Sequence, residues 1–200
     1  MKIHILFGMI GFILLSGCNR AAEKNPRFYD AGVSRELAGH RKAQIKNLKY
    51  ELSFNIPRQK EAAIEGDITL RFDLASRQEV PIDFREEREK IKEVIANGVP
   101  VDKVRFENEH IILPASSTVE GANGIRIRFT AGNQSLNRND EYLYTLLVPD
   151  RARTVFPCFE QPNLKAEFTL QLELPADWKA VSNTYIRSET VTDDRKTVRF

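Results

Sequence analysis

The sequence is poor in the residues that build metal, redox and nucleophilic sites. Its 200 residues hold two cysteines and three histidines, and His4, His40 and His110 stand too far apart for a metal-binding spacing. No His-Glu-x-x-His, Cys-x-x-Cys, Gly-x-Ser-x-Gly or phosphate-binding loop occurs in it. We therefore expect no catalytic residue, no metal ligand and no cofactor in this chain.

The sequence also lacks an excess of either charge. Its 30 lysine and arginine residues are balanced by 28 aspartate and glutamate residues, which gives a formal net charge of +2. A dedicated nucleic-acid binder carries a strongly basic surface, so nucleic acid is excluded as a partner. With 42% hydrophobic residues, a chain of this length can bury one sizeable core.

The first residues have the pattern of an export signal. Met1 and Lys2 give a positive start, and residues 3–15 form an apolar run that is shorter than the roughly 20 residues needed to span a bilayer. The small residues at positions 16 and 17 precede Cys18, as in the lipobox of bacterial lipoproteins. We predict a signal peptide over 1–17 and a diacylglycerol on Cys18, which anchors the chain without a span. The alternative is a buried helix that ends in cysteine.

The same pattern predicts where the protein resides. A lipobox indicates the bacterial cell envelope. Asn19 follows the cysteine, whereas an aspartate there is associated with retention in the inner membrane of enteric bacteria. We therefore expect the lipid-anchored protein in the outer membrane.

A polar stretch and a short helix are predicted next. Residues 18–33 carry no periodic apolar pattern and are interpreted as a polar linker. Ser34 has the character of a helix N-cap, and Leu37, His40 and Gln44 follow at helical spacing. This spacing predicts one helix over residues 35–46.

From Leu48 onward the hydrophobic pattern has a period of two, which is typical of half-buried strands. Asn97-Gly98 is a strong hairpin signal, and Gly66 suggests a bulge or a close approach. No strand–helix–strand rhythm and no internal repeat is present. The pattern predicts an all-β fold, an antiparallel sandwich or an open barrel, with strands over 48–56, 64–74, 80–84, 91–95, 125–129 and 168–174.

One stretch, residues 142–183, is specific enough to suggest a family. It resembles the N-terminal domain of the aminopeptidase N family of zinc metallopeptidases, and with upstream pieces in the same order the resemblance covers residues 32–200. The pieces that carry it are Tyr144-Thr145, Ala152-Arg153, Phe156 to Pro162 (FPCFEQP), Lys165 to Phe168 (KAEF), Pro175, Trp178 and Ala180 to Asn183.

The resemblance implies a saddle-shaped, antiparallel or mixed β-sandwich over residues 34–200, with the predicted helix at its start. Residues 198–200 have the pattern of a strand in progress, so we expect the domain to be truncated at its C-terminal end. The family's zinc-binding catalytic domain is absent here. Zinc is therefore implied for a full-length parent, and this chain alone is not expected to be catalytic.

Two functions follow as alternatives. In the first, the domain closes the substrate cleft of a lipid-anchored zinc aminopeptidase that removes N-terminal residues from peptides. Its partners are then its own catalytic domain, peptides with a free N-terminus, and the membrane through Cys18. In the second, the chain is a non-enzymatic surface lipoprotein that uses the sandwich as a binding module.

The resemblance also identifies one position that departs from the family pattern. Matched through Thr145 and Pro149, Val148 occupies the place of a polar residue that helps to hold the substrate's α-ammonium group, and Leu146 replaces a glutamine. Valine cannot accept a hydrogen bond. This departure implies that the parent enzyme holds the amine by other means, prefers other substrates or is a weak aminopeptidase.

Four residues of the same stretch carry further expectations. Arg151, Arg153 and Glu160 fit either a charged substrate clamp or ion pairs that stabilise the 157–162 loop, and the second interpretation is favoured. Cys158 lies between proline and phenylalanine, and we expect a buried, inert thiol.

Overall fold

The computed structural model describes residues 26–200, so the predicted signal peptide, Cys18 and the first part of the predicted linker lie outside the described residues. One end of the chain carries the 3-10 helix η1 (Pro26–Tyr29) and the helix α1 (Arg35–Gln44). Three further 3-10 helices interrupt the strands, and they are η2 (Arg88–Lys90), η3 (Ala115–Ser117) and η4 (Ala152–Thr154).

The rest of the described chain is built from strands. Their bounds are β1 (Ile45–Asn55), β2 (Glu65–Leu74), β3 (Val80–Asp83), β4 (Ile91–Ala96), β5 (Val99–Pro100), β6 (Arg105–Glu107), β7 (His110–Leu113), β8 (Gly121–Thr130), β9 (Leu136–Arg138), β10 (Leu143–Thr145), β11 (Glu167–Pro175), β12 (Ser188–Thr192) and β13 (Arg195–Arg199). The predicted fold class, mostly strands with one short α-helix, is confirmed.

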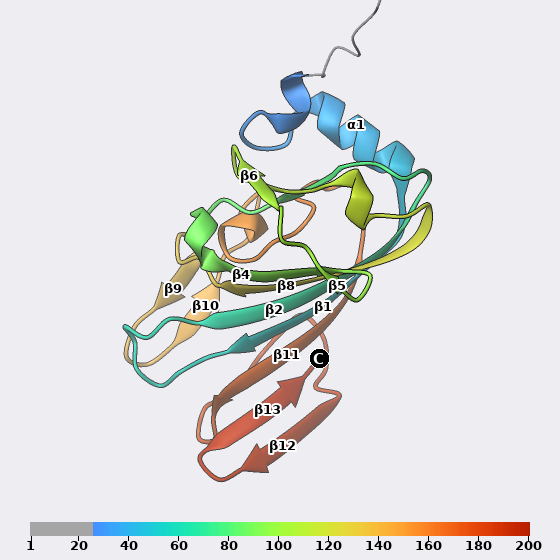
Figure 1. The fold of residues 1–200 in the computed structure, drawn as a ribbon. Helices are drawn as coiled ribbons and strands as arrows, with labels where there is room; N and C mark the ends of the chain where they lie inside the picture. The colour runs from blue at the N-terminus through green and yellow to red at the C-terminus, as the bar shows by residue number, and fades with distance from the viewer. Residues whose placement is uncertain (1–25) are drawn as a thin grey trace, which may run out of the picture.

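The strands form three sheets. An eight-stranded sheet has the order β12-β13-β11-β1-β2-β8-β4-β5, a three-stranded sheet has the order β3-β7-β6, and β9 pairs with β10. Neighbouring strands are antiparallel except β1 and β11, which are parallel. In Figure 1, α1 lies at one end of the molecule and the β12–β13 hairpin at the opposite end.

One core joins the large sheet to the three-stranded sheet. Leu52 of β1, Ile68 of β2 and Ile127 of β8 lie side by side in register, and all three are buried. From the other layer, the Phe84 ring packs edge-on against Phe129 with 5.8 Å between ring centroids. In β1, β2 and β8 the predicted alternation therefore places one face in the core and turns the other outward, whereas β3 and β7 are buried at every position.

The Asn97-Gly98 hairpin is confirmed. Both residues have positive φ angles, 53° and 82°, and they join β4 to β5. A two-residue turn with two positive φ angles matches the twist of the strands that flank it, and glycine adopts such an angle without a steric penalty.

Of the two alternatives predicted for Gly66, a bulge or a close approach, the structure shows a close approach of the Phe129 ring. Gly66 lies opposite Phe129 in the β2–β8 register, and a Cβ atom at Gly66 would lie 2.3 Å from the tip of that ring. The irregularity between β1 and β2 falls elsewhere, between Lys46 and Lys49, where Asn47 has a φ of 53°.

This contact gives a stability prediction. Gly66→Ala should lower the free energy of unfolding by about 1–3 kcal/mol, because the Phe129 ring must move out of its packed position. Gly124→Ala in β8 is the matched control, since the nearest atom to its Cβ lies at an ordinary contact distance of 3.7 Å. Urea unfolding followed by circular dichroism measures both. Equal stability of the two variants would contradict the account.

The helix begins as predicted but ends early. The backbone N–H of Leu37 donates to Oγ of Ser34 at 3.0 Å, which confirms the cap. The helix ends at Gln44 instead of residue 46, because the chain turns directly into β1 at Ile45. The buried residues of the helix are Leu37 and Arg41.

Residues 26–33, in the predicted polar linker, make contacts with the rest of the domain. Tyr29 Oη donates to Glu79 at 2.6 Å, and its carbonyl accepts from the Asn108 side chain at 2.7 Å. The Asp30 carbonyl lies 2.9 Å from Nε2 of His110. These contacts fix the segment against the three-stranded sheet, and a polar composition alone does not reveal them.

Candidate functional site

The segment from Tyr142 to Val148 presents a row of apolar side chains to solvent. Tyr142, Tyr144, Leu146 and Val148 alternate along an extended chain, and each is between 50% and 70% exposed. We call these four side chains the apolar strip. The Tyr142 and Tyr144 rings are 5.9 Å apart. Eight of the 11 exposed large hydrophobic side chains in residues 26–200 fall between residues 142 and 186, so exposed apolar surface is concentrated in this part of the chain.

Local hydrogen bonds shape this segment. The Asn139 side chain accepts the backbone N–H groups of Glu141 and Tyr142, both at 2.8 Å, which closes the turn between β9 and β10. The intervening side chains Leu143 and Leu147 turn inward and pack against the core. The strip is therefore held in a defined conformation with its apolar side outward.

The structure places Val148 at the exposed end of the strip. Its side chain is 70% exposed and carries no hydrogen-bonding atom. Leu146, which the family resemblance matched to a glutamine position, is 50% exposed. Neither side chain can act as a counter-group for an ammonium ion.

Arg153 and Glu160 are brought together. Arg153 lies in η4 with only 8% of its side chain exposed, and its guanidinium contacts the carboxylates of Glu109 and Asp150. Its backbone N–H donates to Glu160 Oε2 at 2.8 Å. Burial raises the pKa of the Glu160 carboxyl, and the N–H of Arg153 opposes that shift. These groups bind one another, which favours the loop-stabilising interpretation over a substrate clamp.

Cys158 is buried, as expected. Its residue is 3% exposed, and burial together with the nearby Glu160 carboxylate raises the pKa of the thiol well above its ordinary value. Its backbone pairs with Asp83, with N–H···O distances of 2.8 and 3.0 Å. A protonated, enclosed thiol is a poor nucleophile.

The most connected buried group is Asp83, which sequence reasoning did not identify. Arg41 donates to both carboxylate oxygens at 2.8 and 2.6 Å. His110 Nδ1 lies 2.8 Å from Oδ1, and the backbone N–H of Glu160 donates to Oδ2 at 2.8 Å. We call this arrangement the Asp83 junction. It joins α1, β3, β7 and the loop after β10 at one carboxylate.

Electrostatics keep Asp83 ionised. Burial alone would raise the pKa of its carboxyl, but the Arg41 charge and the His110 hydrogen bond hold that pKa below its ordinary value of 3.8. This environment exists only in the folded chain, because the groups that surround Asp83 come from residues that are distant in sequence. The polar residue between Ile82 and Phe84 was the one signal in the sequence, and it does not distinguish a buried carboxylate from a solvated one.

The lowered pKa predicts an acid-dependent loss of stability. The folded-state value lies below the unfolded value, so the stabilisation is complete above pH 3.8 and is lost as the pH falls through the folded-state pKa. We expect the difference in unfolding free energy between the wild type and Asp83→Asn to shrink below pH 3.8. Urea unfolding across that range measures it, and a difference independent of pH would contradict the assignment.

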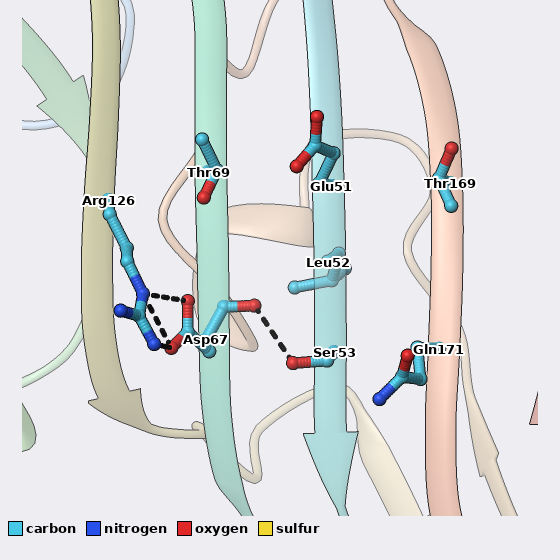
Figure 2. Close-up of a pocket in the computed structure, with 8 residues that line it drawn as sticks. All are labelled: Glu51, Leu52, Ser53, Asp67, Thr69, Arg126, Thr169 and Gln171. Carbon is cyan, nitrogen blue, oxygen red and sulfur yellow. Dashed lines mark hydrogen bonds and ion pairs between the residues drawn. The ribbon is translucent and has the colours of Figure 1, made fainter. Parts of the chain in front are cut away.

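The outer face of the large sheet carries a shallow polar groove. Figure 2 shows its lining side chains on the neighbouring strands β8, β2, β1 and β11. Its charged groups are paired within the sheet, since Arg126 binds Asp67 at 2.6 Å and Arg71 binds Glu51 at 2.8 Å. This self-paired surface is suited to water and contrasts with the apolar strip.

Residues 26–200 contain no group of three or more His, Cys, Asp or Glu side chains that could hold a metal ion. Within the same residues, no helix has the length and apolar character needed to cross a membrane.

The described residues thus form a β-rich module. Its buried charged side chains bind groups of its own loops, and its apolar strip is exposed to solvent. The chain belongs to the Peptidase M1 N-terminal domain family, which it matches over residues 46–200. This result confirms the family that the sequence pattern indicated.

Curated relatives are aminopeptidases. Aminopeptidase N of Streptomyces lividans is 32% identical over 166 residues, which is 76% of this chain and 19% of that protein. Glutamyl aminopeptidase of Sus scrofa is 44% identical over 46 residues, which is 23% of this chain and 5% of that protein. The chain therefore spans less than a fifth of the length of these relatives.

Solved structures show the same fold. The M1 zinc metallopeptidase of Deinococcus radiodurans superposes with a TM-score of 0.66 at 19% identity, over 78% of this chain and 38% of that chain. Yeast LTA4 hydrolase superposes with a TM-score of 0.60 at 18% identity, over 78% of this chain and 27% of that one.

Proposed function

We propose that this chain is the N-terminal domain of a longer zinc aminopeptidase, in which it closes the substrate cleft. The observation that carries the proposal is the apolar strip, in which Tyr142, Tyr144, Leu146 and Val148 are exposed side by side along one segment. A monomeric domain rarely exposes such a surface unless another surface covers it. The aminopeptidase relatives contain the additional length that would provide that cover.

In this proposal Tyr142, Tyr144 and Leu146 of the strip pack against the catalytic part of the same polypeptide, and Val148 at the end of the strip faces the cleft. The self-paired charges on the outer sheet face, such as Arg126 with Asp67, need no partner and would stay in water. The substrates would be peptides with a free N-terminus. A mutant of the Deinococcus radiodurans enzyme is described as bound to the substrate Tyr-Ser-Ala, which supports this class.

Zinc would be held entirely by the catalytic part. The described residues offer no suitable ligand set, so this domain would act by shaping the cleft rather than by chemistry. The direct test is hydrolysis of an aminoacyl-amide by the whole protein, with and without a chelator. We expect chelator-sensitive activity in the whole protein and none in residues 1–200 alone. Absence of activity in the zinc-loaded whole protein would favour the non-enzymatic binding module instead.

Val148 would give the cleft an apolar wall at the position where the family resemblance implies a polar residue. Val148→Glu should add a counter-charge for the substrate's ammonium group and lower KM for an aminoacyl-amide by about tenfold, which corresponds to about 1.4 kcal/mol. Val99→Glu is the control, because Val99 is equally apolar and exposed but lies in β5, outside the apolar strip. An equal effect of both variants, or none at Val148, would remove this residue from the cleft.

We further propose that Cys18 carries the lipid anchor and places the enzyme in the bacterial outer membrane. The support is the short apolar run followed by Ser16, Gly17 and Cys18. Labelled palmitate should be incorporated into the wild type and not into Cys18→Ser, which should leave the membrane fraction. Membrane retention of the unlabelled Ser variant would contradict the anchor.

A further inference from the structure

The helix α1 lies outside the matched region, residues 46–200, yet it binds the loop that carries the FPCFEQP sequence. Gln161 donates its side-chain N–H to the Ala38 carbonyl at 3.1 Å, and Lys42 donates to the Asn163 carbonyl at 3.0 Å. The Arg41 guanidinium lies 5.1 Å from the centroid of the Phe159 ring. One face of the helix therefore packs against this loop.

Arg41 provides the central contact. Its side chain is 2% exposed and donates hydrogen bonds to both carboxylate oxygens of Asp83. Asp83 also accepts the backbone N–H of Glu160. A bidentate arginine–carboxylate pair fixes direction as well as distance. The position of the loop backbone at residue 160 is therefore set through Asp83 by a residue of α1.

The contacts continue from the loop to the apolar strip. Glu160 accepts the backbone N–H of Arg153 at 2.8 Å, and the Arg153 guanidinium contacts Asp150 at 3.4 Å. The backbone N–H of Arg151 donates to the Leu147 carbonyl at 2.9 Å. Asp150 lies two positions after Val148, so a continuous set of contacts connects α1 to the exposed end of the strip.

We propose that α1 holds residues 148–163 in place, and we call this role of the helix the latch. In this role Arg41 is a positioning residue for the substrate-facing side of the domain. The functional half of this inference rests on the function proposed above, while the latch itself rests on the contacts. A buried ion pair adds little net stability over an apolar pair of similar volume, but it fixes one geometry. What Arg41 contributes is the placement of residues 148–163.

The consequence concerns the end of the protein that would carry the lipid. The segment before α1 is itself fastened, since Asp30 contacts His110 and Tyr29 contacts Glu79. His110 is also part of the Asp83 junction. The latch would thus couple the anchored N-terminal segment to the proposed cleft wall, and loosening it would alter substrate binding without touching the chemistry.

The test is hydrogen exchange of the whole protein, read by mass spectrometry of its peptides, together with steady-state kinetics. In Arg41→Met we expect amides of residues 148–163 to exchange at least about tenfold faster, and by a larger factor than the amides of β2 and β8. KM for an aminoacyl-amide should rise several-fold while kcat stays within about twofold. Arg41→Lys, which keeps the charge, should recover part of both effects.

The matched control is Arg126→Met, which breaks a bidentate arginine–aspartate pair on the outer sheet face and should leave residues 148–163 unchanged. Faster exchange confined to residues 35–44 would overturn the latch. If exchange rises throughout the domain, the double variant Arg41→Met/Asp83→Asn decides, because it leaves no unpaired carboxylate. Local loosening at 148–163 in the double variant supports the latch, and protection equal to the wild type overturns it. A wild type without aminopeptidase activity would refute the proposed function, while the exchange data would still decide the latch.

Discussion

Replacing Asp83 by alanine will lower the free energy of unfolding of the domain by about 3–5 kcal/mol. The substitution removes the acceptor of a guanidinium group that is 2% exposed, and it also leaves the backbone N–H of Glu160 without its partner. Buried donors that lose their acceptor retain the full cost of leaving water. The slowest-exchanging amides of β1 and β2 report this free energy within the whole protein.

Asp67→Ala is the control for this prediction. Asp67 also binds an arginine with both oxygens, but the Arg126 side chain is 52% exposed. Exposed pairs contribute about 1 kcal/mol or less. If the two alanine variants lose the same stability, the Asp83 junction does not hold the loops as described.

The second large effect concerns the apolar strip. Tyr144→Lys combined with Leu146→Lys should weaken the contact between this domain and the rest of the protein by about 3 kcal/mol or more, because each buried apolar side chain contributes about 1.5–3 kcal/mol. In a calorimetric scan of the whole protein, we expect an unfolding transition of the N-terminal domain to separate and move to lower temperature.

Two exposed valines outside the strip supply the control. Val99 and Val119 are 65% and 46% exposed, and changing both to lysine should leave the scan unchanged, since most exposed substitutions alter stability by about 0.5 kcal/mol or less. A wild-type scan for the Tyr144 and Leu146 variant would show that the strip faces water in the whole protein.

The repeated local patterns of the sequence predicted most of the fold. Alternating apolar residues fix which face of a strand is buried, and Asn97-Gly98 fixes a turn through its own backbone preferences. Ser34 fixes the start of α1 in the same local way. The parallel pairing of β1 with β11 was not specified, because strands more than a hundred residues apart carry no local signal of their register.

The candidate site was predicted unevenly for the same reason. Val148 and Leu146 were identified because they depart from a family pattern, and the structure places both at the surface. The Asp83 junction was missed because Arg41 and Asp83 are 42 positions apart, and Glu160 lies a further 77 positions along the chain. A charged residue in a strand or helix is normally solvated, so only the three-dimensional packing shows that Arg41 and Asp83 are buried.

The intact mass of the native protein, isolated from membranes with an antibody against this domain, tests the central claim most directly. We expect a mass several times the 22.9 kDa of this chain, with bound zinc and with an N-terminus at lipid-modified Cys18. A mass equal to residues 18–200 plus lipid would contradict it, and the β-sandwich would then be a binding module in its own right.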